Sequence, residues 1–192
     1  MKVENRKSVF IAMFSAIICI GSFIIIPIGT IPIVLQNMLV ILAGLLLGFP
    51  HGAASVGLFL VLGTLGFPVF SGGKGGLAIL TGPTGGFLIG YFFAAIIVGI
   101  IAKKPSTTEN NFSIRNILKL TLASITGFCV IYITGIIQYI KITNHDILTA
   151  ITTCIIPFLI GDLIKLIIVI PIAAKLRKTS ARYISSEETE IQ

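Results

Sequence analysis

Long apolar runs, interrupted by short groups of glycine and proline, are the main pattern of this chain. No Asp, Glu, Lys or Arg lies between Lys7 and Lys74. A helix needs about 20 apolar residues to cross the hydrocarbon core of a bilayer, so this uncharged stretch holds more than one span. Proline and glycine divide the runs because they interrupt helices. The pattern predicts six helical segments, at about residues 8–26, 33–47, 53–65, 83–102, 114–140 and 147–174.

The second and third segments are short for full spans, so we expect them to be tilted or partly re-entrant. No repeat with a period of 20 to 50 residues is present, and no part of the sequence suggests a separate soluble domain. The predicted fold is therefore an all-α integral membrane protein, with residues 1–192 forming a single transmembrane domain. Any activity that needs a nucleotide-binding module must come from another protein.

Composition supports a membrane protein. The chain is 55% hydrophobic and 11% charged, with a mean hydropathy of +1.06, whereas soluble domains are about 25% charged. The net charge of +7 does not indicate a nucleic-acid partner, because the basic residues cluster near the ends of apolar segments and form no single patch. The basic start of the chain is followed by about 20 apolar residues without a convincing cleavage site, so we interpret it as a retained first span.

The distribution of Lys and Arg predicts the orientation in the membrane. With six spans both termini share one side, and eleven of the fourteen Lys and Arg residues fall on that side. Cytoplasmic loops carry the excess of basic residues, so we expect both termini to be cytoplasmic. The turn at 27–32, the glycine-rich loop between the third and fourth segments, and the loop around His145 would then lie at the external face.

Asp162 and Lys165 are the charged residues within the apolar part of a span. Facing lipid, each would cost about 2.5 to 3.5 kcal/mol, so both should face the interior. Their i, i+3 spacing puts them on one helix face. Two interpretations remain open: a structural ion pair that sets the rotation of the helix, or a site for a ligand that presents both donors and acceptors. Pro157 and Gly161 just before them could open the helix locally.

The stretch from Gly72 to Phe87 contains seven glycines in sixteen residues. It is not a phosphate-binding P-loop, because Lys74 is followed by Gly75 and not by Ser or Thr. Glycines allow positive φ angles and close approach of the main chain to a ligand. The stretch is therefore either a flexible external connector or one wall of a pocket, and Lys74 is either a solvated loop charge or a ligand contact.

Other polar or small residues inside apolar segments are further candidates. Gln36 and Asn37 lie at the start of the second span, and one of these amides should face the interior, as a ligand contact or as a hydrogen bond between helices. Gly86 belongs to a smooth helix face that suits another helix or a ligand. Tyr91 suits either an aromatic pocket wall or an anchor at the membrane interface.

Neither a metal site nor a cofactor is expected. Two histidines lie in turns without ligand-spaced partners, and three cysteines lie in apolar segments without CxxC spacing, as packing residues would: His51, His145, Cys19, Cys129 and Cys154. In the first segment, Ala12 and Ala16 form a small-xxx-small pair that permits close contact, within the bundle or with a partner subunit.

Taken together, PIGTIPIVLQNMLVILAGLLLG, GFPVFSGGKGG, GPTGGFLIGY and GDLIK resemble the biotin-specific substrate-capture component, the BioY family, of energy-coupling factor transporters. The resemblance covers about residues 12–175, and GPTGG with the preceding GG-x-GG is its specific part. It implies six membrane helices with cytoplasmic termini, an external pocket, and high-affinity capture of biotin that is delivered by toppling in the membrane. It also implies a transmembrane coupling protein and two cytoplasmic ATPases as partners, in the cytoplasmic membrane of a prokaryote.

The resemblance assigns the acidic and basic pair of the last helix to Asp162 and Lys165, and the partner-binding alanine motif to Ala12 and Ala16. Biotin's ureido ring offers two N–H donors and one carbonyl acceptor, so a carboxylate could accept from it while an ammonium or a loop amide donates to it. The candidate substrate-binding residues are Asp162, Lys165, Gln36, Gly73, Gly75, Thr84, Gly86 and Tyr91.

Other functions remain as alternatives. The chain could capture a different vitamin, such as thiamine or riboflavin. It could also be an intramembrane enzyme with Asp162 as general base and Lys165 tuning its pKa. The sequence contains neither a Ser-His-Asp pattern nor HExxH nor paired acidic motifs, so we expect a transport protein and not an enzyme. A pore would need polar faces on several helices, which these Ile-, Leu- and Gly-rich segments lack.

Overall fold

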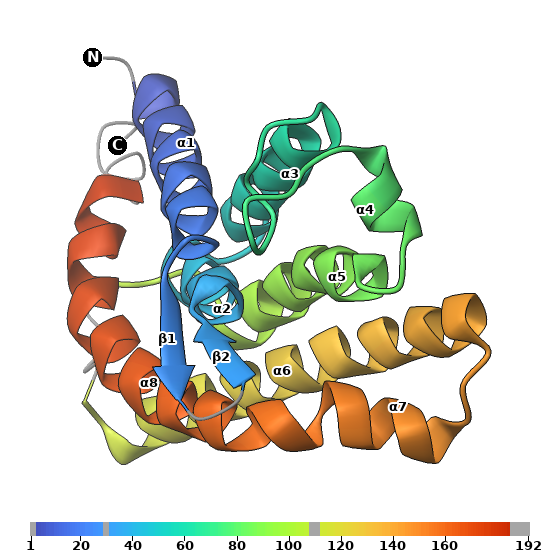
Figure 1. Ribbon diagram of the computed structural model, residues 1–192. Coiled ribbons are helices and arrows are strands. Elements are labelled where there is room, and N and C mark those ends of the chain that lie inside the picture. Colours follow the sequence, from blue (N-terminus) through green and yellow to red (C-terminus); the bar gives the residue numbers. More distant parts are fainter. Residues whose placement is uncertain (1–2, 29–30, 108–111, 185–192) are drawn as a thin grey trace.

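The computed structural model describes residues 3–28, 31–107 and 112–184, and Figure 1 shows its arrangement. The described part is almost entirely helical, as a membrane bundle requires. Its elements are α1 (Val3–Gly21), β1 (Ile25–Ile28), β2 (Ile31–Val34), α2 (Gln36–Leu47), α3 (His51–Thr64), α4 (Leu77–Thr81), α5 (Gly85–Ala102), α6 (Ile114–Thr143), α7 (Ile147–Cys154) and α8 (Ile156–Ile184).

Helix α2 is the centre of the bundle. It contacts α1, α3, α5, α6 and α8, and Figure 1 shows it nearly end-on between its neighbours. Ten of its twelve residues are buried, which fits a helix that is apolar on all sides. It begins with two amides, Gln36 and Asn37, so its N-terminal end brings polar groups into an otherwise apolar core.

Three described helices are long and apolar enough to cross a membrane: α5, α6 and, within α8, Ile156–Arg182. The helices α2 and α3 are apolar but shorter. Large aliphatic side chains stay exposed on the outer faces, for example Ile137 at 63% and Ile167 at 70%. Such faces suit lipid, in which an exposed Ile costs nothing.

Glycines on α5 let it pack closely against α6. A Cβ added at Gly90 would collide with the Thr134 hydroxyl, and one at Gly86 would collide with the backbone of α6. On α6, a Cβ at Gly135 would collide with the Phe87 ring. Small residues commonly permit this kind of approach between membrane helices.

A buried arginine joins three helices at one end of the bundle. Arg177 of α8 donates to the carbonyl of Leu45 on α2 at 2.6 Å and to that of Ala102 on α5 at 2.9 Å. Ser180, one turn later, donates to the carbonyl of Leu46 at 2.6 Å. The last carbonyls of a helix have no partner within the helix and attract cations, so these contacts satisfy the C-terminal ends of α2 and α5.

The structure corrects the sequence expectation in three places. The first segment, expected as a helix over residues 8–26, is helical over Val3–Gly21. The chain then forms an antiparallel pair in which Pro27 of β1 lies opposite Pro32 of β2. The fold is therefore not strictly all-α. Proline is tolerated because a two-stranded ribbon has an outer edge on each strand, where no N–H is needed.

The other two differences concern the glycine-rich stretch and the last segment. Residues 77–81 form the short helix α4, where the sequence suggested only a loop or a pocket wall. The last segment, expected as one helix over residues 147–174, is divided at Ile155 into α7 and α8. Pro157 follows this break in the first turn of α8, where its missing N–H costs no helical hydrogen bond.

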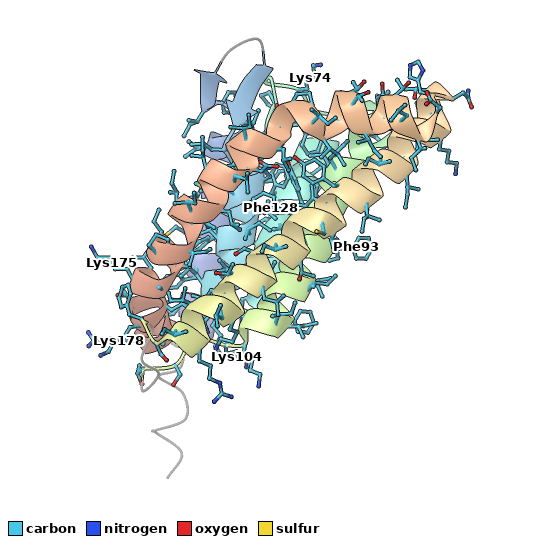
Figure 2. All side chains as sticks on the ribbon, turned by 90° about the horizontal axis from the view of Figure 1, so that it is seen from below. Lys74, Phe93, Lys104, Phe128, Lys175 and Lys178 are labelled. Carbon is cyan, nitrogen blue, oxygen red and sulfur yellow. The ribbon has the colours of Figure 1, made fainter. Side chains whose placement is uncertain are left out.

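The two ends of the bundle differ in charge. Figure 1 shows the start of α1 and the end of α8 at the same end of the molecule. In Figure 2, Lys104, Lys175 and Lys178 lie at this end, and Lys74 lies at the opposite end.

Candidate functional site

A cavity of about 460 Å³ lies at the end of the bundle that carries Lys74. This volume is in the range of sites that bind small organic ligands. Its apolar and aromatic lining comes from Val34, Phe70, Ile79, Phe87, Leu88, Tyr91, Ile131, Tyr132, Tyr139, Cys154 and Phe158. Its polar lining comes from Gln36, Asn37, Ser71, Lys74, Thr84, Thr153 and Lys165. A largely apolar wall with a few placed polar groups is typical of a site that encloses and orients its ligand.

A polar cluster joins three helices at one wall of the cavity. The ammonium of Lys165 lies 2.8 Å from Oδ1 of Asp162 and donates to Oδ1 of Asn37 at 2.8 Å. Nδ2 of Asn37 donates to Oδ1 of Asp162 at 3.0 Å, and the Tyr132 hydroxyl donates to Oδ2. Asp162 and Lys165 are 6% and 4% exposed. A buried ion pair survives when further hydrogen bonds satisfy it, as they do here.

The position of this cluster follows from helix geometry. Asp162 and Lys165 share a face of α8, and Asn37 lies in the first turn of α2. The N-terminal end of a helix attracts negative charge, so the Asp162 carboxylate is well placed beside α2. The cluster therefore supports the fold as well as the cavity wall.

Lys165 and Asp162 differ in what they offer a ligand. An ammonium has three donors, and two of those of Lys165 are used by Asp162 and Asn37. Lys165 also lines the cavity, so a third donor remains for a ligand acceptor. Asp162 is absent from the described lining, and both its oxygens accept hydrogen bonds from protein groups. Its position supports a role in holding Lys165, Asn37 and Tyr132 in place.

Gln36 connects the cavity wall to the loop before the glycine-rich stretch. Its Nε2 donates to the carbonyl of Val69 at 3.1 Å and to that of Ile18 at 3.4 Å. The side chain is fully buried, and its Oε1 has no hydrogen-bond partner among the described residues. Two backbone acceptors orient the amide nitrogen, and the oxygen remains a buried acceptor without a partner among the described residues.

Of the eight candidate substrate-binding residues, four line the cavity: Gln36, Thr84, Tyr91 and Lys165. Asp162 lies directly behind the wall. The three glycines shape the surrounding chain and are not part of the described lining. The sequence allowed either another helix or a ligand on the helix face of Gly86. In the structure, Gly86 packs against α6.

The other two glycines determine the path of the loop. A Cβ at Gly75 would collide with the carbonyl of Phe67, and Gly73 has a φ of +69° that favours glycine. Ser71 and Lys74, which belong to the same loop, line the cavity. The glycine-rich stretch therefore forms part of the cavity wall, through its side-chain-bearing residues.

Several cavity residues were not expected from the sequence. Tyr132 reaches Asp162 from α6, and Thr153, Cys154 and Phe158 line the cavity on both sides of the break between α7 and α8. The signal for Tyr132 was available, because a tyrosine in an apolar span needs a partner for its hydroxyl. The spacing of residues along the chain does not show which tyrosine contacts the Asp162 carboxylate.

Ala12 and Ala16 lie away from the cavity. Both are exposed on α1, next to Val9 at 53% and Met13 at 43% exposure. Phe14 and Ile18 on the opposite side of α1 are buried in the core. The alanine pair therefore does not pack within the bundle and presents a small-residue face to its surroundings.

Among the residues that the structure describes, no group of three His, Cys, Asp or Glu side chains could hold a metal ion. In the turn between α6 and α7, Asp146 caps α7 by accepting from the backbone N–H of Thr149. The hydrogen bond from the Thr149 hydroxyl holds the pKa of the Asp146 carboxyl below its usual value. This acid is fully exposed and takes no part in the cavity.

Comparison with known proteins gives a consistent result. A family model described as the BioY family matches residues 1–182. A protein of Thermotoga maritima named biotin transporter BioY is 36% identical over 174 residues, covering 90% of this chain and 96% of the relative. A protein of the same name from Lactococcus lactis subsp. cremoris is 38% identical over 185 residues, covering 92% and 95%.

A solved structure supports the same assignment. It is the S-component for biotin from an ECF-type ABC transporter, with 36% identity and a TM-score of 0.76 over 91% of this chain and 92% of that one. The likeness thus extends over nearly the whole chain. This chain belongs to the BioY family of multi-pass membrane proteins.

Proposed function

We propose that the chain binds biotin in the cavity and takes it up as the substrate-specific component of an energy-coupling factor type ABC transporter. The observation that carries this proposal is Lys165, a buried cation at the cavity wall whose position is set by Asp162 and Asn37 and which keeps one donor for a ligand. The relatives named as biotin transporters and the S-component structure support the choice of ligand.

The cavity matches the two kinds of surface that biotin presents. The carbonyl of its ureido ring accepts hydrogen bonds, and Lys165 is the donor that we assign to it. The ureido N–H groups need acceptors, and we assign one of them to the amide of Gln36, a lining residue whose Oε1 has no partner among the described residues. The thioether ring and the methylene chain suit the aromatic and aliphatic lining. Neither a nucleophile with a base nor a metal cluster is present among the described cavity residues, so the proposed role is binding without chemistry.

A binding measurement on the purified protein tests this proposal. We expect labelled biotin to bind, and unlabelled thiamine and riboflavin not to compete with it. Asp162→Ala should weaken biotin binding by at least about 1.5 to 3 kcal/mol, the value of hydrogen bonds to charged groups, because Lys165 loses its partner. The Lys165→Met variant should lose a similar amount.

Asp146→Asn is the matched control, because it neutralises an exposed carboxylate outside the cavity. Its affinity for biotin should equal that of the wild type. Unchanged affinity in both Asp162→Ala and Lys165→Met would reject the assigned site. Binding of labelled thiamine or labelled riboflavin, with no binding of labelled biotin, would transfer the function to another vitamin.

We infer the membrane arrangement from the same features. Six segments cross the cytoplasmic membrane of a prokaryote: α1, α2, α3, α5, α6, and α7 together with α8. Both termini are cytoplasmic, and the cavity with its glycine-rich loop opens to the outside. The basic end formed by Lys104, Lys175 and Lys178 supports this orientation, because cytoplasmic ends are rich in Lys and Arg. The whole chain acts as one transmembrane domain.

The proposed partners are a transmembrane coupling protein and two cytoplasmic ATPases. The described chain has no nucleotide-binding module, so ATP-driven release requires other subunits. The exposed face of α1 around Ala12 and Ala16 is the contact that we assign to the coupling protein. The assignment is supported by the S-component to which this chain is similar, which belongs to an ECF-type ABC transporter.

A further inference from the structure

The cavity has an unbalanced charge. Among its described lining residues, the side chains with a formal charge are Lys165 and Lys74. Lys165 is paired with Asp162 at 2.8 Å, directly behind the wall. Lys74 takes part in no ion pair with a described residue, and it is exposed. The cavity therefore has a balanced polar cluster at its inner wall and one unbalanced cation at its rim.

The backbone of Lys74 is held in a defined place. Phe70 and Lys74 form an antiparallel bridge, with the Phe70 N–H donating to the Lys74 carbonyl at 2.8 Å and the reverse bond at 3.2 Å. The Phe70 ring is 1% exposed and packs edge-on against Phe59 of α3 at 5.5 Å. A Cβ at Gly63 would collide with this ring. The loop that carries Lys74 is thus anchored on α3.

The same loop is tied to the polar cluster. Gln36 donates to the carbonyl of Val69, the residue before Phe70, and Asn37, next to Gln36, belongs to the Lys165 cluster. The first turn of α2 therefore contacts both the polar cluster around Lys165 and the loop that carries Lys74. These contacts fix the position of the Lys74 backbone relative to Lys165, although Lys74 lies on a glycine-rich loop.

A second positive feature borders the cavity. Thr84 precedes α5, and both Thr84 and Phe87 of its first turn line the cavity. The N-terminal end of an 18-residue helix carries partial positive charge. It adds to the charge of Lys74 and favours an anionic ligand group near the rim.

We propose that Lys74 is a specificity-determining residue that binds the ligand's carboxylate and so sets the ligand's direction in the cavity. The neutral polar ring then lies at the Lys165 cluster, the apolar chain crosses the aromatic lining, and the carboxylate lies at the rim beside Lys74. This inference rests on the proposed function, and it adds that the cavity selects acids over their neutral derivatives.

The test compares biotin with biotinamide, in which the carboxylate is replaced by a neutral amide. At low ionic strength we expect the wild type to bind biotin about tenfold more tightly than biotinamide, because a charge-assisted contact is lost. In Lys74→Gln this ratio should fall several-fold through weaker binding of biotin, with the affinity for biotinamide unchanged, and the part that stays is the contribution of the α5 N-terminus. Lys74→Glu should reverse the preference.

Lys141→Gln is the matched control, because Lys141 is an exposed lysine in the last turn of α6 and is absent from the described cavity lining. It should keep the wild-type ratio. A wild-type ratio of about one, or an unchanged ratio in Lys74→Gln, would overturn the inference while leaving biotin binding intact. A wild type that binds neither compound would instead reject the proposed function. Retained binding of biotinamide shows that a variant is folded.

Discussion

At the scale of single residues, Asp162 and Lys165 have different roles although they lie one turn apart on the same helix. The Lys165 ammonium lines the cavity and keeps a donor for a ligand, whereas the Asp162 oxygens are occupied by protein donors. The carboxylate thereby orients Lys165, Asn37 and Tyr132, which line the cavity. Burying it is tolerable because Lys165, Asn37 and Tyr132 all donate to it.

Tyr132→Phe tests how much this network depends on one hydroxyl. The substitution removes a donor from the buried Asp162 carboxylate, so we expect the free energy of unfolding to fall by about 1.5 to 3 kcal/mol. The melting temperature of the purified protein in detergent measures the effect. Tyr139→Phe is the control, because it removes a hydroxyl from the same cavity that bonds to no described residue. Equal melting temperatures for the two variants would contradict the assignment.

At the scale of elements, small residues have two distinct uses. Gly86 and Gly90 of α5 bring α6 close, and both are enclosed by the bundle. Ala12 and Ala16 of α1 repeat the same small-residue spacing, but they are exposed. The inner pair supports the cavity wall, and the outer pair leaves a flat surface on which another helix can pack.

Ala16→Trp tests the outer pair. Because Ala16 is exposed and is absent from the described cavity lining, the isolated protein should keep its affinity for biotin. The bulky side chain should block close contact by the coupling protein, so co-purification of the coupling protein and the ATPases, and biotin uptake by cells, should fall strongly. Leu122→Trp, on the exposed face of α6, should leave assembly unchanged. An Ala16→Trp protein that assembles and transports like the wild type would reject this contact.

At the scale of the whole molecule, the two ends of the bundle are built for different surroundings. One end carries Lys104, Lys175 and Lys178 and is held together by buried Arg177, which satisfies the last carbonyls of α2 and α5. The other end carries the cavity, the hairpin β1–β2 and the glycine-rich loop. The cavity lies at the N-terminal ends of α2 and α5, opposite the C-terminal ends that Arg177 caps.

Labelling of single cysteines tests the orientation. In a background in which the native cysteines are replaced by alanine, His145→Cys should react with a membrane-impermeant maleimide on intact cells. Thr107→Cys, in the linker between α5 and α6, should react only after permeabilisation. The reverse pattern would invert the proposed topology. The native cysteines to be replaced are Cys19, Cys129 and Cys154.

Some features of this protein follow from the sequence without the structure. Long uncharged runs require helices buried in lipid or protein, because unsatisfied backbone groups are too costly there. The i, i+3 spacing of Asp162 and Lys165 puts both on one helix face, and their cost in lipid turns that face inward. These conclusions depend on local periodicity and composition, which a single sequence contains.

Other features were decided by tertiary structure alone. Ile25–Ile28 and Ile31–Val34 form a strand pair, because short apolar runs with proline fit several local conformations and long-range packing selects one. The break at Ile155, the contact of Tyr132 with Asp162 and the packing of Gly86 on α6 likewise depend on which helices become neighbours. Spacing along one helix determines which residues share a face, but only the packed bundle determines what that face meets, because each contact joins segments far apart in the chain.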